Sequence, residues 1–153
     1  MNTKPWGVRG TGGFTLIEIL VVIGIVAILA AIVIIAINPA RQFAQARNAQ
    51  RESNVNTILN AIGQNLADNK GVFTCASIGT TPDATARAIG TGAVSLACLT
   101  PIYIPSALPF DPDGGSATDT LYTISVDTGR YTVCAPKHAE AAIPGSIAYC
   151  LTR

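Results

Sequence analysis

One stretch constrains the fold more than any other: residues 14–37 read FTLIEILVVIGIVAILAAIVIIAI, and Glu18 is their single charged side chain. As a helix, these 24 residues would extend roughly 36 Å, enough to cross a bilayer with some tilt. A secretory signal has a shorter apolar stretch, about 7–15 residues, followed by a small-residue cleavage site. We therefore predict a membrane-spanning helix and not a signal peptide that is lost.

The position of Glu18 within the apolar run requires an explanation. A carboxylate costs on the order of 2.5–3.5 kcal/mol if it reaches the centre of a bilayer. It could lie at the membrane interface near the start of the helix, where a negative charge also suits the helix dipole. Residues 1–13, MNTKPWGVRGTGG, precede the run with two basic side chains and no helical or strand periodicity. They are typical of a flexible leader, and their charges favour a cytoplasmic N-terminus.

The segment Gly13-Phe14-Thr15-Leu16-Ile17-Glu18, with a basic leader before it and an apolar run after it, resembles the N-terminus of type IV pilins and type II secretion pseudopilins. The resemblance covers about residues 9–37. It implies that a prepilin peptidase cuts between Gly13 and Phe14 and that Phe14 becomes the N-methylated first residue. It further implies subunit assembly through Phe14 and Glu18, because a buried carboxylate is tolerable when the amine of a neighbouring subunit pairs with it.

The sequence departs from this family at the end of the apolar run. Many pilins have a helix-disrupting proline inside the run, whereas this run contains none and Pro39 lies just beyond its end. Proline disfavours helical dihedrals at the residue before it, so we expect any local melting or kink at Asn38. The sequence does not distinguish local melting from a kink.

A second helical segment follows, up to about residue 70. Its apolar residues recur at spacings of three and four, which gives one stripe that can pack against the protein's own sheet; they are Val55, Ile58, Leu59, Ile62 and Leu66. Lys70 and Gly71 favour the end of the helix there.

The remainder of the chain has strand and turn signals. Residues 120–126 and 131–136 alternate with a period of two around the turn DTGR, which predicts a β-hairpin, and residues 145–151 are a candidate third strand. The predicted fold is α+β and pilin-like: a long helix over 14–70, transmembrane in its first half and amphipathic in its second, packed on a small antiparallel sheet. We assign residues 1–13 to a leader, 14–70 to the helix and 71–153 to a globular β domain.

Four cysteines lie in the second half of the chain without a CxxC pair, which favours disulfides in an oxidising compartment over a zinc site. They are Cys75, Cys98, Cys134 and Cys150. Four cysteines allow three pairings. We favour Cys75–Cys98 and Cys134–Cys150 because each pair closes a short loop, although the sequence does not decide.

A glycine-rich loop at residues 108–122 contains Asp111, Asp113 and Asp119. Oxygen-rich loops bind calcium, and DPDGG loosely resembles the calcium loop of major pseudopilins, so these three aspartates are a candidate site. Turn chemistry alone also explains Asp-Pro and Asp-Gly-Gly, and the spacing does not fit an EF-hand. Beyond this candidate calcium, we expect no cofactor.

The sequence contains no sign of catalysis or of bulk electrostatic attraction. The formal net charge is +1, and the chain has one histidine, His138, in a segment that we interpret as a surface loop. It has no P-loop, no dinucleotide fingerprint and no Gly-x-Ser-x-Gly. Glu140 follows His138 closely, but this spacing defines no catalytic pair. We predict that the protein is not an enzyme, and the sequence does not decide whether it binds nucleic acid.

We therefore expect a structural subunit that polymerises into a type IV pilus. A major pseudopilin of a type II secretion system is the closest alternative, and a monomeric membrane-anchored binding domain is a third. Calcium-dependent folding would favour the pseudopilin, whereas two disulfides favour the exposed pilus. The resemblance implies as partners identical subunits in a helical filament, the prepilin peptidase, and an inner-membrane platform with its motor ATPase. It places the precursor in the inner membrane and the assembled pilus at the cell surface.

Overall fold

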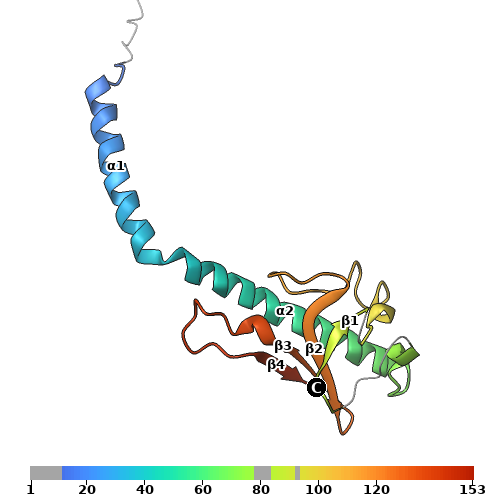
Figure 1. Ribbon diagram of the computed structural model, residues 1–153. Coiled ribbons are helices and arrows are strands. Elements are labelled where there is room, and N and C mark those ends of the chain that lie inside the picture. Colours follow the sequence, from blue (N-terminus) through green and yellow to red (C-terminus); the bar gives the residue numbers. More distant parts are fainter. Residues whose placement is uncertain (1–11, 78–83, 92–93) are drawn as a thin grey trace, which may run out of the picture. The chain divides into compact units, whose positions relative to one another are not determined.

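The computed structural model describes residues 12–77, 84–91 and 94–153 and has an α+β fold (Figure 1). Two helices come first, α1 (Leu16–Ile37) and α2 (Pro39–Asp68). Four strands follow, β1 (Arg87–Gly90), β2 (Asp119–Asp127), β3 (Arg130–Ala135) and β4 (Tyr149–Thr152). Single 3₁₀ turns lie between them: η1 (Thr74–Ser77), η2 (Ala97–Leu99) and η3 (Pro136–His138). The predicted fold class is thus confirmed.

The predicted helix over residues 14–70 is interrupted at Asn38. Asn38 has φ 40° and ψ 83°, in the left-handed region, and α2 begins at Pro39. Proline suits the first turn of a helix because it has no N–H to donate, while the residue before it avoids helical dihedrals. Internal contacts also divide the chain here, into Met1–Pro39 and Ala40–Arg153, so α2 belongs to the same compact unit as the sheet.

The sheet is an antiparallel meander in the order β1-β2-β3-β4. The predicted hairpin is present as β2 and β3, and Asp127 pairs with Arg130 across the turn. Thr128 and Gly129 both have positive φ, 48° and 80°, as a two-residue hairpin of this twist requires. The turn of the hairpin therefore lies where the sequence DTGR predicts it.

The last strand is shorter than predicted. We expected a strand over residues 145–151, but β4 begins at Tyr149. Gly145 has φ 76°, and the Ser146 N–H donates to the carbonyl oxygen of Ile143 at 3.1 Å, so the chain turns there. A residue in a left-handed turn cannot continue a strand, and residues 145–148 belong to the loop before β4.

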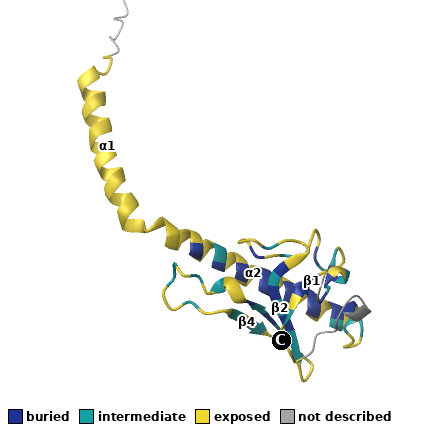
Figure 2. Cartoon of the chain, viewed as in Figure 1, coloured by how far each residue is buried: buried dark blue, intermediate teal, exposed yellow. Residues whose placement is uncertain are grey.

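The core lies between α2 and the sheet (Figure 2). From α2, the predicted stripe contributes Val55, Ile58, Leu59 and Ile62, all at most 1% exposed, while Leu66 is partly buried against them. The sheet and its connections contribute a second set of buried residues: Ile89, Leu96, Leu99, Tyr122, Ile124 and Val133. The stripe is therefore satisfied within the chain, as a helix packed on its own sheet requires.

Candidate functional site

The proposed processing site lies immediately before α1. Gly12 and Gly13 have no regular secondary structure, and a Cβ added at either would meet no atom within 4 Å. Phe14 is 84% exposed. The backbone around the Gly13–Phe14 bond is thus open in the subunit, as cleavage by a peptidase requires, while the basic part of the leader lies outside the described residues.

Glu18 and Thr15 cap the first turn of α1 reciprocally. The Thr15 N–H and its hydroxyl both donate to Oε2 of Glu18 at 2.9 Å, and the Glu18 N–H donates to the Thr15 hydroxyl oxygen at 3.3 Å. This capping box satisfies the carboxylate inside a single subunit. We did not predict it, although Thr15-Leu-Ile-Glu18 has the required T-x-x-E spacing.

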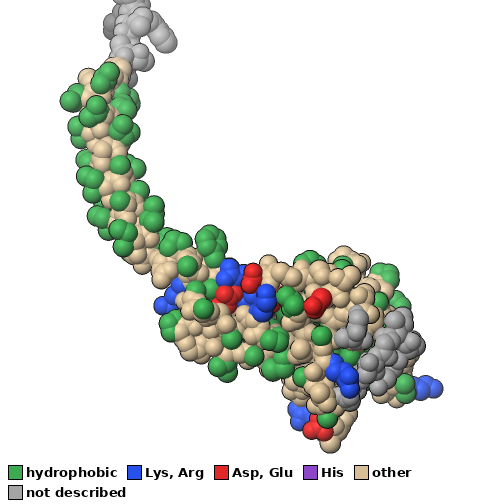
Figure 3. All heavy atoms as spheres, in the orientation of Figure 1, with side chains coloured by type: hydrophobic (Ala, Val, Ile, Leu, Met, Phe, Trp, Pro, Cys, Tyr) green, Lys and Arg blue, Asp and Glu red, His purple; other side chains and the backbone are tan. Residues whose placement is uncertain are grey.

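The side chains of α1 are unpartnered within the described part of the chain. No residue of α1 is buried, and hydrophobic side chains cover the visible face of this helix in Figure 3. It is also the one described helix that is long and apolar enough to cross a membrane. A helix that is hydrophobic all round requires an apolar environment, either lipid or other helices.

A second cluster of functional groups lies on α2, where Arg51 is fully buried. Its Nε and Nη2 donate to the two carboxylate oxygens of Asp111 at 2.7 and 3.0 Å, and its Nη1 donates to Glu140 at 2.6 Å and to Asn48 at 2.7 Å. Arg47 binds the same Glu140 through two further hydrogen bonds, at 2.7 and 2.8 Å. These charges join α2 to two loops that are distant in the sequence.

The electrostatics of this cluster favour the charged forms. Hydrogen bonds from Arg47 lower the pKa of Glu140 to about 2; burial opposes this shift, and Arg51 adds to it. For Arg51, burial alone would lower the pKa, but hydrogen bonds to Asp111 and Glu140 raise it above its ordinary value. Both groups are therefore ionised at neutral pH and neutralise each other.

We did not predict the roles of His138 and Glu140. Glu140 binds the two arginines across about 90 residues of chain, and His138 is partly buried with its Nε2 3.1 Å from Oε1 of Glu52. His138 Nδ1 lies 2.9 Å from the carbonyl oxygen of Ile147. These contacts anchor the segment after β3 on α2. No local pattern in the sequence could have indicated them, because they depend on tertiary packing.

The three aspartates of the candidate calcium loop have different surroundings. Asp111 is buried and bound to Arg51, whereas Asp113 lies beside Lys137, which donates to its backbone oxygen at 2.6 Å. Asp119 accepts a hydrogen bond from the N–H of Leu121 at 3.0 Å. The described residues include no group of three or more acidic, histidine or cysteine side chains arranged to hold a metal. Calcium binding here stays a prediction.

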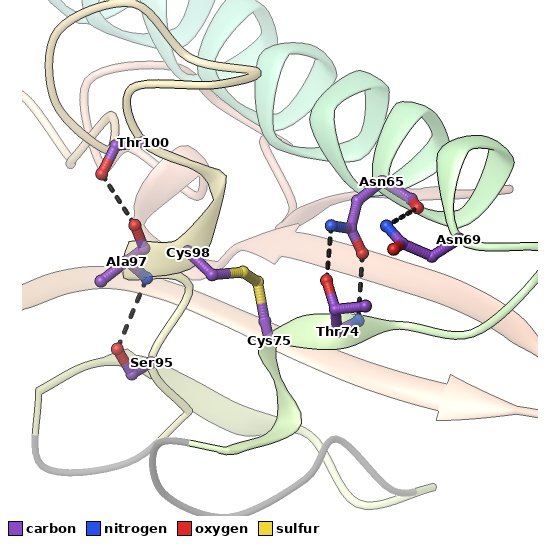
Figure 4. The surroundings of a disulfide bond; sticks show 8 residues. All are labelled: Asn65, Asn69, Thr74, Cys75, Ser95, Ala97, Cys98 and Thr100. Atoms are coloured by element: carbon purple, nitrogen blue, oxygen red, sulfur yellow. Dashed lines mark hydrogen bonds between the residues drawn. A yellow bond between two sulfur atoms is a disulfide. The ribbon is translucent and has the colours of Figure 1, made fainter.

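The structure contains two disulfides, Cys75–Cys98 and Cys134–Cys150. The first joins η1 to η2 beside the end of α2, where Asn65 accepts from the Thr74 N–H and donates to its hydroxyl (Figure 4). The second joins directly paired residues of β3 and β4. Both bonds lie within the Ala40–Arg153 unit, which we call the sheet unit; the first joins two 3₁₀ turns and the second joins two strands.

An exposed Gly13–Phe14 junction, an unpartnered apolar helix and a disulfide-bonded α+β unit fit a membrane-anchored precursor of the pilin-like class. The family comparison agrees, because residues 8–37 match the prokaryotic N-terminal methylation motif. The chain thus carries the motif of type IV pilins and pseudopilins that its N-terminal residues predicted. No curated protein and no solved structure matches the chain. The motif points to a structural subunit, a role that is usually not enzymatic.

Proposed function

We propose that this protein is a structural subunit of a type IV pilus and polymerises through α1. The observation that carries the proposal is α1 itself: an apolar helix with no buried residue, within residues 8–37 that match the N-terminal methylation motif. Lipid can cover such a helix in the precursor, and the helices of identical subunits can cover it in a filament.

Phe14 and Glu18 would form the assembly contact. After cleavage, the N-methylated amine of Phe14 on one subunit would pair with the Glu18 carboxylate on the next. In the single subunit this carboxylate accepts two hydrogen bonds, from the N–H and the hydroxyl of Thr15. Assembly would replace these neutral donors by the positively charged amine of Phe14. The pair would also neutralise the carboxylate, which would otherwise be an isolated charge among packed apolar helices, and this would favour the filament.

The proposed partners follow from this function. A prepilin peptidase would cleave after Gly13 and methylate Phe14, and an inner-membrane platform with a motor ATPase would extract subunits from the membrane. The filament would then lie outside the cell, in an oxidising environment that suits two disulfides. A type II secretion pseudopilus is the second candidate, since the same motif serves both systems.

The test compares two neighbouring glycines. Gly13→Val should abolish cleavage and leave the full precursor in the membrane, with no subunit in material sheared from cells. Gly12→Val is the matched control, because an added side chain is equally unhindered at both positions. Sheared filaments from Gly13→Val cells at the control yield would contradict the proposal. Long surface filaments would favour the pilus over the pseudopilus.

A further inference from the structure

Filament assembly through α1 does not explain why a buried ion cluster lies on α2. Two positive and two negative side chains meet there: Arg47, Arg51, Asp111 and Glu140. Arg51 and Asp111 are both fully buried, and an isolated buried charge would be strongly destabilising. The cluster is neutral as a whole, so its stability depends on the presence of every partner.

The backbone of residues 111–115 forms a tight turn whose hydrogen bonds fix Asp111. The N–H of Asp113 donates to Oδ1 of Asp111 at 2.8 Å, and the N–H of Gly115 donates to the Asp111 carbonyl oxygen at 3.0 Å. A Cβ on Gly115 would lie 2.5 Å from the Asp111 nitrogen, so only glycine fits there without a shift of the backbone. The loop of residues 111–115 thus holds the Asp111 carboxylate in a fixed position, where it binds one cationic group.

That cation is a guanidinium in this chain. The planar fork of Arg51 matches both carboxylate oxygens of Asp111, a bidentate geometry that arginine favours. Its Nη1 donates to Glu140, just after η3, as well as to Asn48, so one side chain fixes two loops on α2.

A calcium ion fits these residues poorly. Calcium requires about 6–8 oxygen ligands, and Arg51 already occupies both oxygens of Asp111. The Asp113 carbonyl oxygen accepts from the ammonium of Lys137, which would repel a second cation nearby. Among the described side chains that are not exposed, no buried nitrogen or oxygen lacks a hydrogen-bond partner, and Asp113 and Asp119 are exposed, so no buried oxygen without a partner is left for a metal to bind.

We propose that Arg51 is the built-in cation of the Asp111 loop and takes the place that a divalent metal would otherwise have. The sheet unit then keeps its fold when divalent cations are removed. The segment after β3, which lines a hollow of about 460 Å³ with α2, is held in place by the same guanidinium through Glu140. This proposal does not rest on the pilus function, because it concerns the folding of the Ala40–Arg153 unit.

The first test measures the Tm of the full-length protein in detergent, with excess EDTA and with millimolar calcium chloride. We expect the two values to agree within about 2 °C, since a ligand that does not bind cannot stabilise the folded state. A rise of more than about 5 °C in calcium would overturn the proposal and support a metal at Asp111, Asp113 and Asp119.

The second test removes the guanidinium of Arg51. Arg51→Met should lower the Tm by about 10–20 °C, because it leaves the Asp111 carboxylate buried without its partner. Arg51→Met combined with Asp111→Asn should regain part of this loss, since the asparagine is neutral and keeps an oxygen for the Asp113 N–H. Arg130→Met, in the exposed β2–β3 turn, is the control and should change the Tm by about 1 °C or less.

A Tm for Arg51→Met equal to that of the Arg130→Met control would overturn the proposal. If Arg51→Met does not fold at all, that result agrees with the proposal, and the comparison of EDTA with calcium on the unmodified protein still decides it.

Discussion

The two helices follow each other directly in the chain, yet they obtain their partners in opposite ways. Between Leu16 and Ile37, α1 is apolar on every side, and none of its residues is buried. In contrast, α2 has a single apolar stripe, and the sheet of the same chain covers it. The first helix thus requires an apolar environment that the described residues do not provide, whereas the second is covered by residues of its own chain.

This difference places the proposed assembly role and the folded sheet in separate parts of the chain. The N-terminal unit, with its exposed apolar helix, can serve anchoring and assembly. The Ala40–Arg153 unit contains the core, both disulfides and the buried ion cluster, and it can fold and display a surface. Changes in one unit should therefore leave the function of the other intact, and four experiments test that separation.

The largest effect should come from Glu18→Ala. We expect filament yield in the sheared fraction to fall at least about tenfold, since one lost charge-assisted contact recurs at every subunit of the filament. The amount of protein in the membrane should not change. Asp127→Ala, at the exposed β2–β3 turn, is the control, and filaments at normal yield from Glu18→Ala cells would refute the assembly role of the Glu18 carboxylate.

The same substitution placed in each helix gives the sharpest contrast. Ile58→Ala should lower the free energy of unfolding of the sheet unit by about 2–5 kcal/mol, because Ile58 is fully buried in the core. Ile25→Ala, in α1, should leave that free energy unchanged. Urea unfolding of the processed protein in detergent, followed by tyrosine fluorescence, measures it, because all four tyrosines lie in the Ala40–Arg153 unit. Equal losses from both variants would show that the two parts are not independent.

Removal of either disulfide should have a somewhat smaller effect. Replacing both cysteines of one pair by serine should cost about 2–4 kcal/mol in the sheet unit. The loss should be slightly greater for Cys75–Cys98, which closes the longer loop, 23 residues against 16. A variant without one of the pairs that keeps the stability of the unmodified protein would show that this disulfide does not stabilise the fold.

Acid should destabilise the sheet unit through Glu140. Because the pKa of Glu140 in the folded protein is about 2, below its ordinary value near 4.5, its contribution is complete above about pH 4.5. It is lost as the pH falls towards 2, and amounts to on the order of 1–3 kcal/mol. Between pH 2 and 4.5, the free energy of unfolding should change less with pH for Glu140→Gln than for the control Asp127→Asn. If it changes equally with pH in both variants, Glu140 does not stabilise the folded protein through its charge.

The elements that the sequence predicted well are those with local signals. The apolar run predicts α1, the stripe from Val55 to Leu66 predicts the packed face of α2, and the DTGR turn predicts the β2–β3 hairpin. The T-x-x-E spacing at Thr15 would also have predicted the capping box. Strand β1 was missed because four residues, RAIG, in a region rich in glycine and threonine, show no alternation.

The ion cluster could not be predicted for a different reason. Arg51 and Glu140 are 89 residues apart, and Arg51 and Asp111 are 60 apart. A charged residue on a helix is usually solvated, and nothing next to Arg51 in the sequence shows that two loops will enclose it. Only the packed structure brings these charges together.

The most direct test of the assembly account is the intact mass of the protein in filaments sheared from cells, together with its N-terminal peptide. We predict a chain that begins at N-methylated Phe14, found in high-molecular-weight material and lacking residues 1–13. A chain that begins at Met1 and occurs only in the membrane fraction would contradict the account, and would make α1 an anchor and not a polymerisation helix.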